Sequence, residues 1–302
     1  MMNRRNFVAI AMLLFTVASW GGMYPIAKSI LLAIDPFWLT AIRYGFTALL
    51  FCGLLLWREG KNAFRFEGKW ISIWWCGTLG FALFNYLVFF GLKYSSPEHG
   101  AIIMAMMPFI ALLINWLSLG KRPPYQDMLA IAFAFVGIIL IITRGNFSSL
   151  LEMDSIFGDC LTLLGALSWV FYTRSAIRFN HWSPLRFTTL TVILGTMSII
   201  VITVVLTLVN IAHAPELTLL NEQLVSLLYI VGPATIIAIL FWNRGIKTVG
   251  ISNGMLFVNL VPVVAFSIGY YQGNSLHSME LVGASIVLVT LAISNLASRR
   301  KG

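Results

Sequence analysis

Long apolar runs, separated by short polar connections, follow one another along almost the whole chain. An α-helix needs about 20 mainly apolar residues to cross the hydrocarbon core of a bilayer. Ten runs of about that length are present: residues 7–27, 37–57, 70–92, 99–119, 126–143, 156–177, 185–209, 223–243, 252–271 and 280–297. The pattern predicts an all-α integral membrane protein with ten transmembrane helices. The first run follows Arg4 and Arg5 and could instead be a signal peptide, but its length, Trp20 and a later counterpart favour a span.

The composition makes lipid the main solvent of this chain. Hydrophobic residues make up 59% of the sequence and charged residues only 10%, whereas an ordinary soluble domain carries about 25% charged residues. So few charges cannot cover a globular surface. Cys52, Cys76 and Cys160 lie inside apolar runs without metal or redox spacing, so we interpret them as small apolar packing residues.

The basic residues predict the orientation in the membrane. When the N-terminus is placed in the cytoplasm, 16 of the 20 basic residues lie on the cytoplasmic side. Lys28, Lys93 and Arg144 lie outside, and Arg43 lies within a span. This bias is typical of the positive-inside rule. It predicts a multi-pass protein of the cytoplasmic (inner) membrane with both termini cytoplasmic. The net charge of +9 is scattered between the runs rather than gathered in a basic patch, so no nucleic-acid partner is expected.

The two halves of the chain resemble each other. Segment 91–108 aligns with 245–262 without a gap, pairing Gly91 with Gly245 and Pro108 with Pro262. Further pairs are Ser19–Trp20 with Ser168–Trp169, Pro36 with Pro184, and Asp127 with Glu280. We therefore predict two five-helix repeats, residues 1–147 and 148–302. Because five is odd, the second repeat enters the membrane inverted, an arrangement common in secondary transporters.

Several of these stretches resemble a known family. SWGGMYPIAK in the first span, LTAIRYGFTALL in the second and GDCLTLLGALSWVFYTRSAIR in the sixth are similar to the EamA-type branch of the drug/metabolite transporter superfamily. The resemblance covers nearly the whole chain and implies export of amino acids or other small metabolites. One position departs from the family: Lys121, in GKRPP, replaces an acidic residue that often follows the fourth span. The matching position after the ninth span is Asn274 or its neighbour, which is again not acidic.

Arg43 is the charged residue that the pattern embeds most deeply. A charged side chain inside a span costs a few kcal/mol unless it is solvated or partnered. It could face the pathway and bind a substrate carboxylate or hold the outer gate, or it could snorkel or cap backbone carbonyls; the family resemblance favours a structural or gating role. Glu98 lies in SSPEHG, which indicates a helix start with Ser96 as N-cap and Pro97 in the first turn. Glu98 could also line an outer vestibule.

Aromatic and amide side chains recur on the first, third, sixth, eighth and ninth spans. If these spans surround one cavity, its lining suits small amphipathic molecules, including amino acids with apolar side chains. The predicted cavity residues are Trp20, Tyr24, Asn85, Tyr86, Phe89, Trp169, Tyr172, Trp242, Asn243, Asn253 and Asn259. Each could instead be a packing residue or an interface anchor. Pro25, Pro108, Pro233 and Pro262 are predicted hinges, although proline is also common in membrane helices without that role.

Several motifs are absent from the sequence. It contains no GxxxxGK[ST] phosphate loop, no HExxH and no metal-ligand cluster, so we expect no cofactor and no enzymatic activity. The four histidines are isolated along the chain, and no carboxylate lies near the middle of a predicted span. Proton coupling would need peripheral groups such as Asp159 and Glu98, or would be absent.

The sequence therefore predicts a secondary transporter that exports amino acids or related compounds by alternating access. Drug efflux and nucleotide-sugar or sugar-phosphate exchange are alternatives within transport. A channel-like protein or membrane scaffold is the alternative from another class. The expected partners are a small-molecule substrate and the lipid bilayer, and a homodimer stays open.

Overall fold

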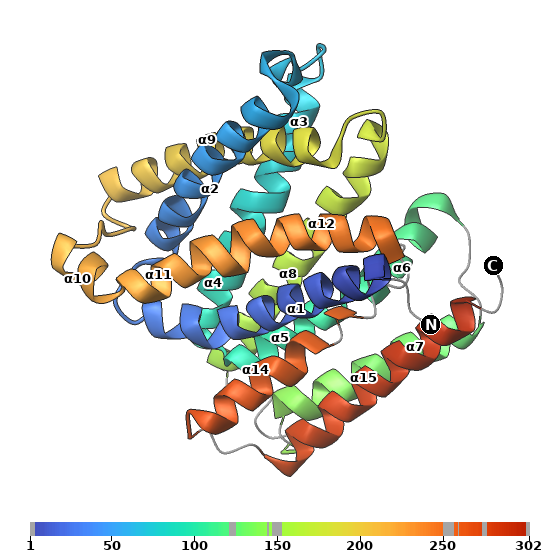
Figure 1. Cartoon of the computed structure of the whole chain (residues 1–302). Helices are drawn as coiled ribbons and strands as arrows, with labels where there is room; N and C mark the ends of the chain where they lie inside the picture. The colour runs from blue at the N-terminus through green and yellow to red at the C-terminus, as the bar shows by residue number, and fades with distance from the viewer. Residues whose placement is uncertain are drawn as a thin grey trace.

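The structure, a computed structural model, describes residues 4–120, 125–143, 145–146, 153–249, 257–258, 260–273 and 277–299. Within these ranges the regular elements are helices, and no strand is present (Figure 1). The first half contains α1 (Arg4–Ile30), α2 (Pro36–Glu59), η1 (Lys61–Phe64), α3 (Trp70–Gly77), η2 (Thr78–Leu83), α4 (Phe84–Tyr94), α5 (Pro97–Ala105), α6 (Met107–Leu119) and α7 (Tyr125–Thr143). The second half contains α8 (Met153–Ser175), η4 (Ala176–Phe179), α9 (Pro184–Leu208), α10 (Leu217–Glu222), α11 (Leu224–Val231), η5 (Gly232–Ile237), α12 (Ala238–Val249), α14 (Leu260–Tyr271) and α15 (Ser278–Arg299).

Six helical segments of the described chain are long and apolar enough to cross a membrane. They are Arg5–Ile30, Pro36–Glu59, Trp70–Tyr94, Ile156–Ser175, Pro184–Leu208 and Leu224–Ile246. Leu260–Tyr271 and Ser278–Thr290 are apolar but shorter. The chain is therefore a helical protein with several candidate membrane spans, and the full count of ten stays a prediction.

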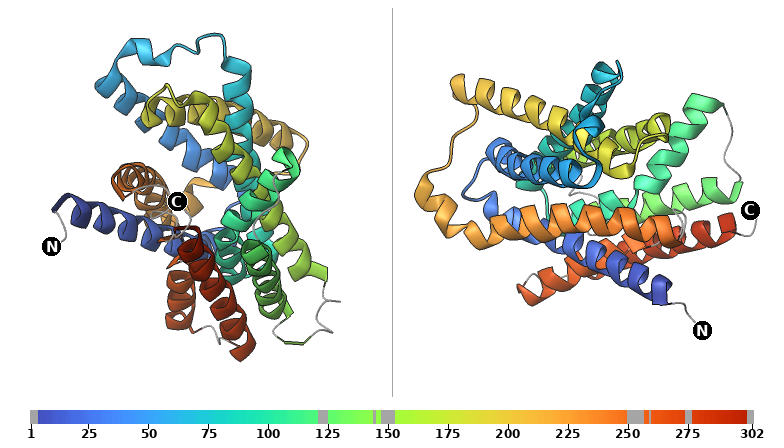
Figure 2. Two further views of the ribbon diagram at one scale, coloured as in Figure 1. Left: turned by 90° about the vertical axis from the view of Figure 1, so that its right-hand side faces the viewer. Right: turned by 45° about the horizontal axis from the view of Figure 1, so that its top comes forward.

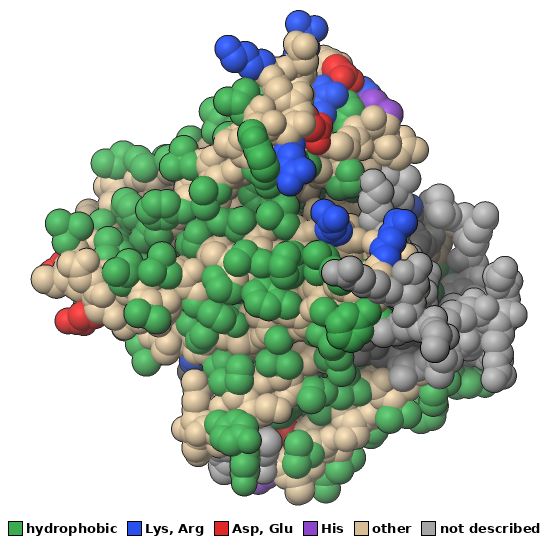
Figure 3. Space-filling view, in the orientation of Figure 1, with side chains coloured by type: hydrophobic (Ala, Val, Ile, Leu, Met, Phe, Trp, Pro, Cys, Tyr) green, Lys and Arg blue, Asp and Glu red, His purple; other side chains and the backbone are tan. Residues whose placement is uncertain are grey.

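The surface is mainly apolar, as expected for a protein surrounded by lipid. Trp57 and Val225 are 74% and 81% exposed, which water would disfavour and acyl chains would not. Figure 3 shows hydrophobic side chains over most of one face. In the same view, Lys and Arg gather around the connection between α2 and α3, together with some acidic side chains, and near the end of α12. Further acidic side chains, without Lys or Arg around them, lie beside α10.

Local sequence signals begin several helices where expected. The predicted cap at Ser96 is confirmed: its Oγ accepts a hydrogen bond from the His99 backbone N–H at 3.2 Å, and Pro97 is the first residue of α5. Asp35 caps α2 in the same manner, accepting from the Phe37 N–H at 2.8 Å. Each cap satisfies a donor that the first helical turn would leave unpaired.

Two long helical segments contain a π-helical turn that the hydrophobic pattern does not reveal. In η5, Pro233 has no N–H to donate, and the Thr235 hydroxyl donates to the Ile230 carbonyl at 2.7 Å. In η2, the carbonyl of Leu79 accepts from the Phe84 N–H and also from Ser168 Oγ on α8, at 2.6 Å. Side chains that enter the backbone ladder in this way widen a turn, and π-turns often occur at functional sites.

The predicted run 99–119 is divided rather than continuous. The first part, α5, ends at Ala105, and α6 begins at Met107. Pro108 is the second residue of α6. A proline has no backbone N–H to donate, and its ring clashes with the carbonyl of the preceding helical turn. The chain therefore turns at Met106.

The helices pack in pairs that join distant parts of the sequence. In Figures 1 and 2, α15 lies along α7, and α4 crosses beside α8. The same packing joins α1 to α12 and α2 to α9. Close approach of α3 to α9 depends on Gly77 and Gly195, because a Cβ built on Gly77 would lie 2.2 Å from the Thr191 carbonyl oxygen. Small residues at such crossings are typical of membrane proteins.

Candidate functional site

Arg43 is buried between helices of both halves of the chain. Its side chain is 5% exposed. The Nε group donates to Thr235 Oγ1 in η5 at 2.7 Å, and Nη1 donates to Asn85 Oδ1 on α4 at 2.8 Å. The guanidinium therefore binds two neutral side chains from separate elements rather than reaching the surface.

Aromatic rings complete the surroundings of this cation. The Arg43 Cζ atom lies 5.2 Å from the centre of the Tyr44 ring and 5.7 Å from that of Phe89, distances suited to cation–π attraction. Asn85 is held in place by its own amide, which donates to the Tyr44 hydroxyl at 3.0 Å and to the Phe81 carbonyl at 2.8 Å. We refer to Arg43, Tyr44, Asn85, Phe89 and Thr235 together as the Arg43 cluster.

The charge of the Arg43 cluster is not balanced within the described chain. Among the described residues, Arg43 forms no ion pair with a carboxylate. Removing a charge from water costs several kcal/mol, and neutral dipoles offset only part of this. The cluster is therefore a buried site of positive potential, suited to attract an anionic group.

An aromatic group extends from the Arg43 cluster towards α8. Phe81 is 5.3 Å from Tyr44 and 5.0 Å from Tyr172, measured between ring centres. Trp169 lies 5.1 Å from Tyr172. Asn85, Phe89, Trp169 and Tyr172, all predicted cavity residues, are thus joined to Arg43 through contacts between side chains.

The other predicted cavity residues fall into different environments. Trp20 and Trp242 contact each other at 5.3 Å between ring centres, which joins α1 to α12. Tyr24 is 4% exposed and packs against Gly100 of α5. Tyr86 turns away from its neighbour Asn85 and donates its hydroxyl to the Ile199 carbonyl at 2.8 Å, so it attaches α4 to α9.

The structure describes the remaining predicted site residues only in part. Asn243 is half-buried in α12. Asn253 and Asn259 lie outside the described residues, as do the side chains of Glu98 in α5 and Pro108 in α6.

The predicted hinge prolines are not equivalent in the structure. Pro25 lies within α1, which continues as one helix to Ile30. Pro262 is buried near the start of α14. Pro233 lies inside the π-turn η5, two residues before Thr235, and so is next to the Arg43 cluster.

Tyr44 and Thr235 are the two members of the Arg43 cluster that the sequence analysis missed, and Thr235 is the one that comes from the other half of the chain. The signal available was a hydroxyl two residues after a proline, in the apolar run GPATII. A hydroxyl at such a position can donate to a backbone carbonyl of the preceding turn, as Thr235 does to Ile230, and still accept from a third group.

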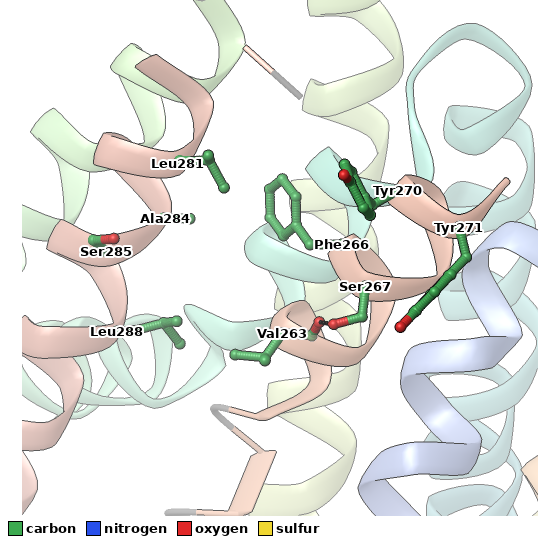
Figure 4. Close-up of a pocket in the computed structure, with 9 residues that line it drawn as sticks. All are labelled: Val263, Phe266, Ser267, Tyr270, Tyr271, Leu281, Ala284, Ser285 and Leu288. Carbon is green, nitrogen blue, oxygen red and sulfur yellow. Dashed lines mark hydrogen bonds between the residues drawn. The ribbon is translucent and has the colours of Figure 1, made fainter. Parts of the chain in front are cut away.

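The described chain also carries a groove between α14 and α15, of about 430 Å³ (Figure 4). Phe266, Val263 and Leu281 point into it, and the exposed Tyr270 and Tyr271 flank it. None of its lining residues belongs to the predicted cavity or carries a charge. Apolar walls with tyrosines at the rim suit contact with lipid.

Comparison with known proteins gives consistent relationships. The EamA-like transporter family matches residues 7–143 and again residues 156–296. The uncharacterized transporter YrdR of Bacillus subtilis (strain 168) is 33% identical over 301 residues, covering 98% of this chain and 93% of that protein. An S-adenosylmethionine/S-adenosylhomocysteine transporter of Chlamydia muridarum is 23% identical over 140 residues, or 46% of this chain and 43% of that protein. A crystal structure of another protein has a TM-score of 0.68 at 17% identity, covering 97% of this chain and 98% of that one.

Proposed function

We propose that this chain, which belongs to the EamA-like transporter family, is a secondary transporter that exports amino acids or related carboxylate-bearing metabolites across the cytoplasmic membrane by alternating access. The observation that carries this proposal is the Arg43 cluster. A buried guanidinium with neutral partners can bind a substrate carboxylate without first breaking an ion pair. The aromatic side chains around Phe81 supply faces for the apolar part of such a molecule.

We propose further that the chain forms ten spans as two inverted repeats, residues 1–147 and 148–302. The two matches to the family, one in each half, support this division. The π-turns also support it, because η2 and η5 lie in the third and eighth predicted spans, which the repeat pairs. Contacts of α2 with α9 and of α7 with α15 join spans that the repeat relates, as an axis between the halves requires.

The orientation follows from the charges. We place both termini in the cytoplasm of the cell, with the connections from α2 to α3 and from α8 to α9 on the same side. The concentration of Lys and Arg near the first of these connections, opposite the acidic side chains beside α10, supports this placement. Labelling of single cysteines introduced at Lys61 and at Glu222 by an impermeant reagent in intact cells tests it: only the second position is expected to react.

The compounds named for one relative suggest which substrates to test first. S-adenosylmethionine and S-adenosylhomocysteine, named for one relative, both contain an α-amino acid group and an aromatic base. Both groups match the chemistry of the Arg43 cluster and its aromatic neighbours. These compounds therefore belong in a panel with amino acids, together with drugs and sugar phosphates, which represent the other two transport alternatives.

The test is uptake of the labelled panel into proteoliposomes that contain the purified protein. We expect saturable uptake of at least one carboxylate-bearing compound and loss of that uptake in Asn85→Ala, because this change removes a partner of Arg43. Leu49→Ala is the matched control, since Leu49 is 70% exposed on the same structure and lies on α2 with Arg43. Failure of every panel member to move, in vesicles where the protein is folded by circular dichroism, would contradict the proposed substrate class.

A further inference from the structure

A second buried polar cluster lies where α4, α5, α8 and α15 meet. His99 Nδ1 lies 3.1 Å from Asp159 Oδ2, and the Ser95 hydroxyl donates to Asp159 Oδ1. On the other edge of the imidazole ring, Nε2 faces Glu280 Oε1 at 3.9 Å. We refer to Ser95, His99, Asp159 and Glu280 as the His99 cluster. This arrangement corrects the prediction that the histidines are isolated, because His99 is 4% exposed and lies between two carboxylates.

Local structure explains how these groups come together. The Ser96 cap fixes the first turn of α5 and so the direction of His99. A Cβ built on Gly158 would lie 2.5 Å from the Gly91 carbonyl oxygen, so the two glycines let α4 and α8 approach until Ser95 reaches Asp159. Glu280 accepts from the His277 backbone N–H at 3.0 Å, which holds its carboxylate at the start of α15.

The protonation of the ring decides whether this cluster is satisfied. His99 Nε2 is buried and has no hydrogen-bond partner. A neutral ring carries one proton, so only one of its nitrogens can donate to a carboxylate; a ring with both nitrogens protonated can donate towards Asp159 and Glu280 together. The second proton also compensates part of the negative charge that two ionised carboxylates place in one buried region.

Further charged and titratable groups lie on the elements packed around the cluster. On α1, Lys28 donates to the carbonyl oxygens of Leu92, Lys93 and Ser95, at 2.5, 3.0 and 2.8 Å. The remaining such groups close in sequence to the cluster residues, or on the facing part of α1, are Tyr24 on α1, Lys93 and Tyr94 on α4, Glu98 beside His99 on α5, Asp154 and Cys160 on α8 and His277 before α15. The described parts of α6 and α14 carry no Asp, Glu, Lys, Arg or His, and α7 carries only Asp127, at its other end.

A metal ion fits this cluster less well than a proton does. The two carboxylates lie against opposite edges of the imidazole ring, so their oxygens do not converge on one point. Among the described residues, no group of His, Cys, Asp and Glu has the geometry to hold a metal ion. A proton needs only the two contacts that the ring already makes.

We propose that His99, Asp159 and Glu280 form a proton-binding site that links transport to the proton gradient. This inference rests on the proposed transport function. The cluster joins α5 of the first repeat to α8 and α15 of the second, so movement of the repeats apart at this end separates His99 from its carboxylates. A proton is taken up from the outer side when the cluster opens outward and is released inside when it opens inward, in exchange for exported substrate.

The first experiment measures the proton directly and needs no substrate. Nitrogen NMR of histidine-labelled protein in lipid nanodiscs reports how many ring nitrogens carry a proton, and the sequence has only four histidines to distinguish. His99→Gln identifies the signal. We expect both nitrogens of His99 to be protonated at neutral pH in the wild type and one to be deprotonated in Asp159→Asn. A neutral His99 ring in the wild type would overturn the proposal.

The second experiment measures coupling in proteoliposomes. The probes are labelled L-leucine and L-phenylalanine, with and without an imposed pH gradient. We expect the gradient to accelerate wild-type transport and this acceleration to fall about tenfold in His99→Gln and Asp159→Asn, the effect of losing one charge-assisted hydrogen bond. Exchange of labelled for unlabelled substrate without a gradient is expected to persist in both variants, which shows that they are folded. His277→Gln is the matched control, because the His277 side chain is exposed and its contact with Glu280 is made by the backbone N–H, which the substitution keeps.

The outcomes separate the two proposals. If wild-type transport is saturable but its rate does not depend on the pH gradient, the proposed proton coupling is overturned and the proposed transport function stands. If neither amino acid is transported, the coupling is measured with a compound of the wider panel that is transported, and the NMR result still decides whether the proton site exists. Loss of gradient acceleration in His277→Gln as large as in His99→Gln also overturns the assignment to this cluster.

Discussion

The Arg43 cluster and the His99 cluster both bury a basic side chain to nearly the same degree, with 5% of Arg43 and 4% of His99 exposed. Their partners differ. Arg43 binds the neutral side chains of Asn85 and Thr235 and lies over aromatic rings, whereas His99 lies between the carboxylates of Asp159 and Glu280. Equal burial therefore comes with opposite charge balance.

This difference separates two tasks. An arginine stays protonated at every physiological pH, so a charge without a carboxylate partner is always ready for an anionic ligand. A histidine can lose its proton, so a site built around it changes charge with pH. In the proposed mechanism, the fold keeps a permanent charge for recognition apart from a variable charge for coupling. The four predictions below test that separation.

The largest effect is expected from Arg43→Gln. The glutamine amide can still donate to Asn85, but the positive charge is lost. Uptake of carboxylate-bearing substrates, as kcat/KM, is expected to fall about 100-fold, corresponding to roughly 3 kcal/mol of charged hydrogen bonding. The melting temperature is expected to change by less than about 4 °C, since removal of an uncompensated buried charge offsets the lost contacts. Normal uptake together with a collapse in stability would make Arg43 a structural residue instead.

Asn85→Asp places a carboxylate beside the basic side chain of the Arg43 cluster, as is already the case in the His99 cluster. A carboxylate beside Arg43 would neutralise the site and compete with the substrate, and it would lose the amide donors to Tyr44 and Phe81. We expect KM to rise about tenfold at neutral pH, the effect of one charged hydrogen bond, and to recover in part as the pH falls and the carboxylate binds a proton. Tyr86→Phe, which changes the neighbouring residue without adding charge, is the control. A KM that is unchanged in Asn85→Asp would show that the substrate does not meet Arg43.

A double-mutant cycle tests whether the two clusters are independent. His99→Gln and Asp159→Asn remove two partners of one contact, so their effects on the free energy of unfolding are expected to couple by more than about 0.5 kcal/mol. Arg43→Gln and Asp159→Asn share no partner and are expected to add within about 0.5 kcal/mol. Unfolding in mixed detergent micelles, followed by tryptophan fluorescence, measures both cycles. Strong coupling between Arg43 and Asp159 would mean that recognition and proton binding belong to one network.

The helices and several of their ends follow from local sequence, but the clusters do not. The long apolar runs and the Ser96–Pro97 start depend on residues close together in the chain. The structure confirms the helix start, and the described parts of the runs are helical, although run 99–119 is divided at Met106. Arg43 and Asn85 were recognisable because polar groups stand out within apolar runs. The contacts that form the cluster join residues far apart in the sequence: Thr235 is 192 positions from Arg43.

The π-turns and the His99 cluster show the same limit. The η2 turn includes a hydrogen bond from Ser168 to Leu79, which lie 89 positions apart, so no local sequence pattern predicts this turn. His99 and Asp159 are 60 positions apart, and Glu280 comes from a third helix. Each residue alone resembles an ordinary polar residue near the end of a span. Only the packing of α4, α5, α8 and α15 brings them together.

The smallest effect is expected at an exposed charge, Glu67, which shows what burial adds to the other two sites. Its carboxylate accepts from Trp182 Nε1 at 3.0 Å and from Arg186 Nη2 at 2.7 Å. The hydrogen bond from Trp182, followed by that from Arg186, lowers the pKa of Glu67 below its usual value. Because the pKa is lower in the folded state, the ionised carboxylate stabilises the fold above the unfolded pKa, and this contribution is lost as the pH falls through the folded pKa.

Glu67→Gln is therefore expected to lower the melting temperature at pH 7 by only about 1 °C, because solvent screens an exposed pair. The difference from the wild type is expected to shrink as the pH falls below the ordinary pKa of a glutamate and through the lower pKa of the folded state. Melting curves of both proteins from pH 7 into the acid range measure this. A shift at Glu67 as large as that of Asp159→Asn would mean that partners alone, and not burial, decide how much a charged group matters in this fold.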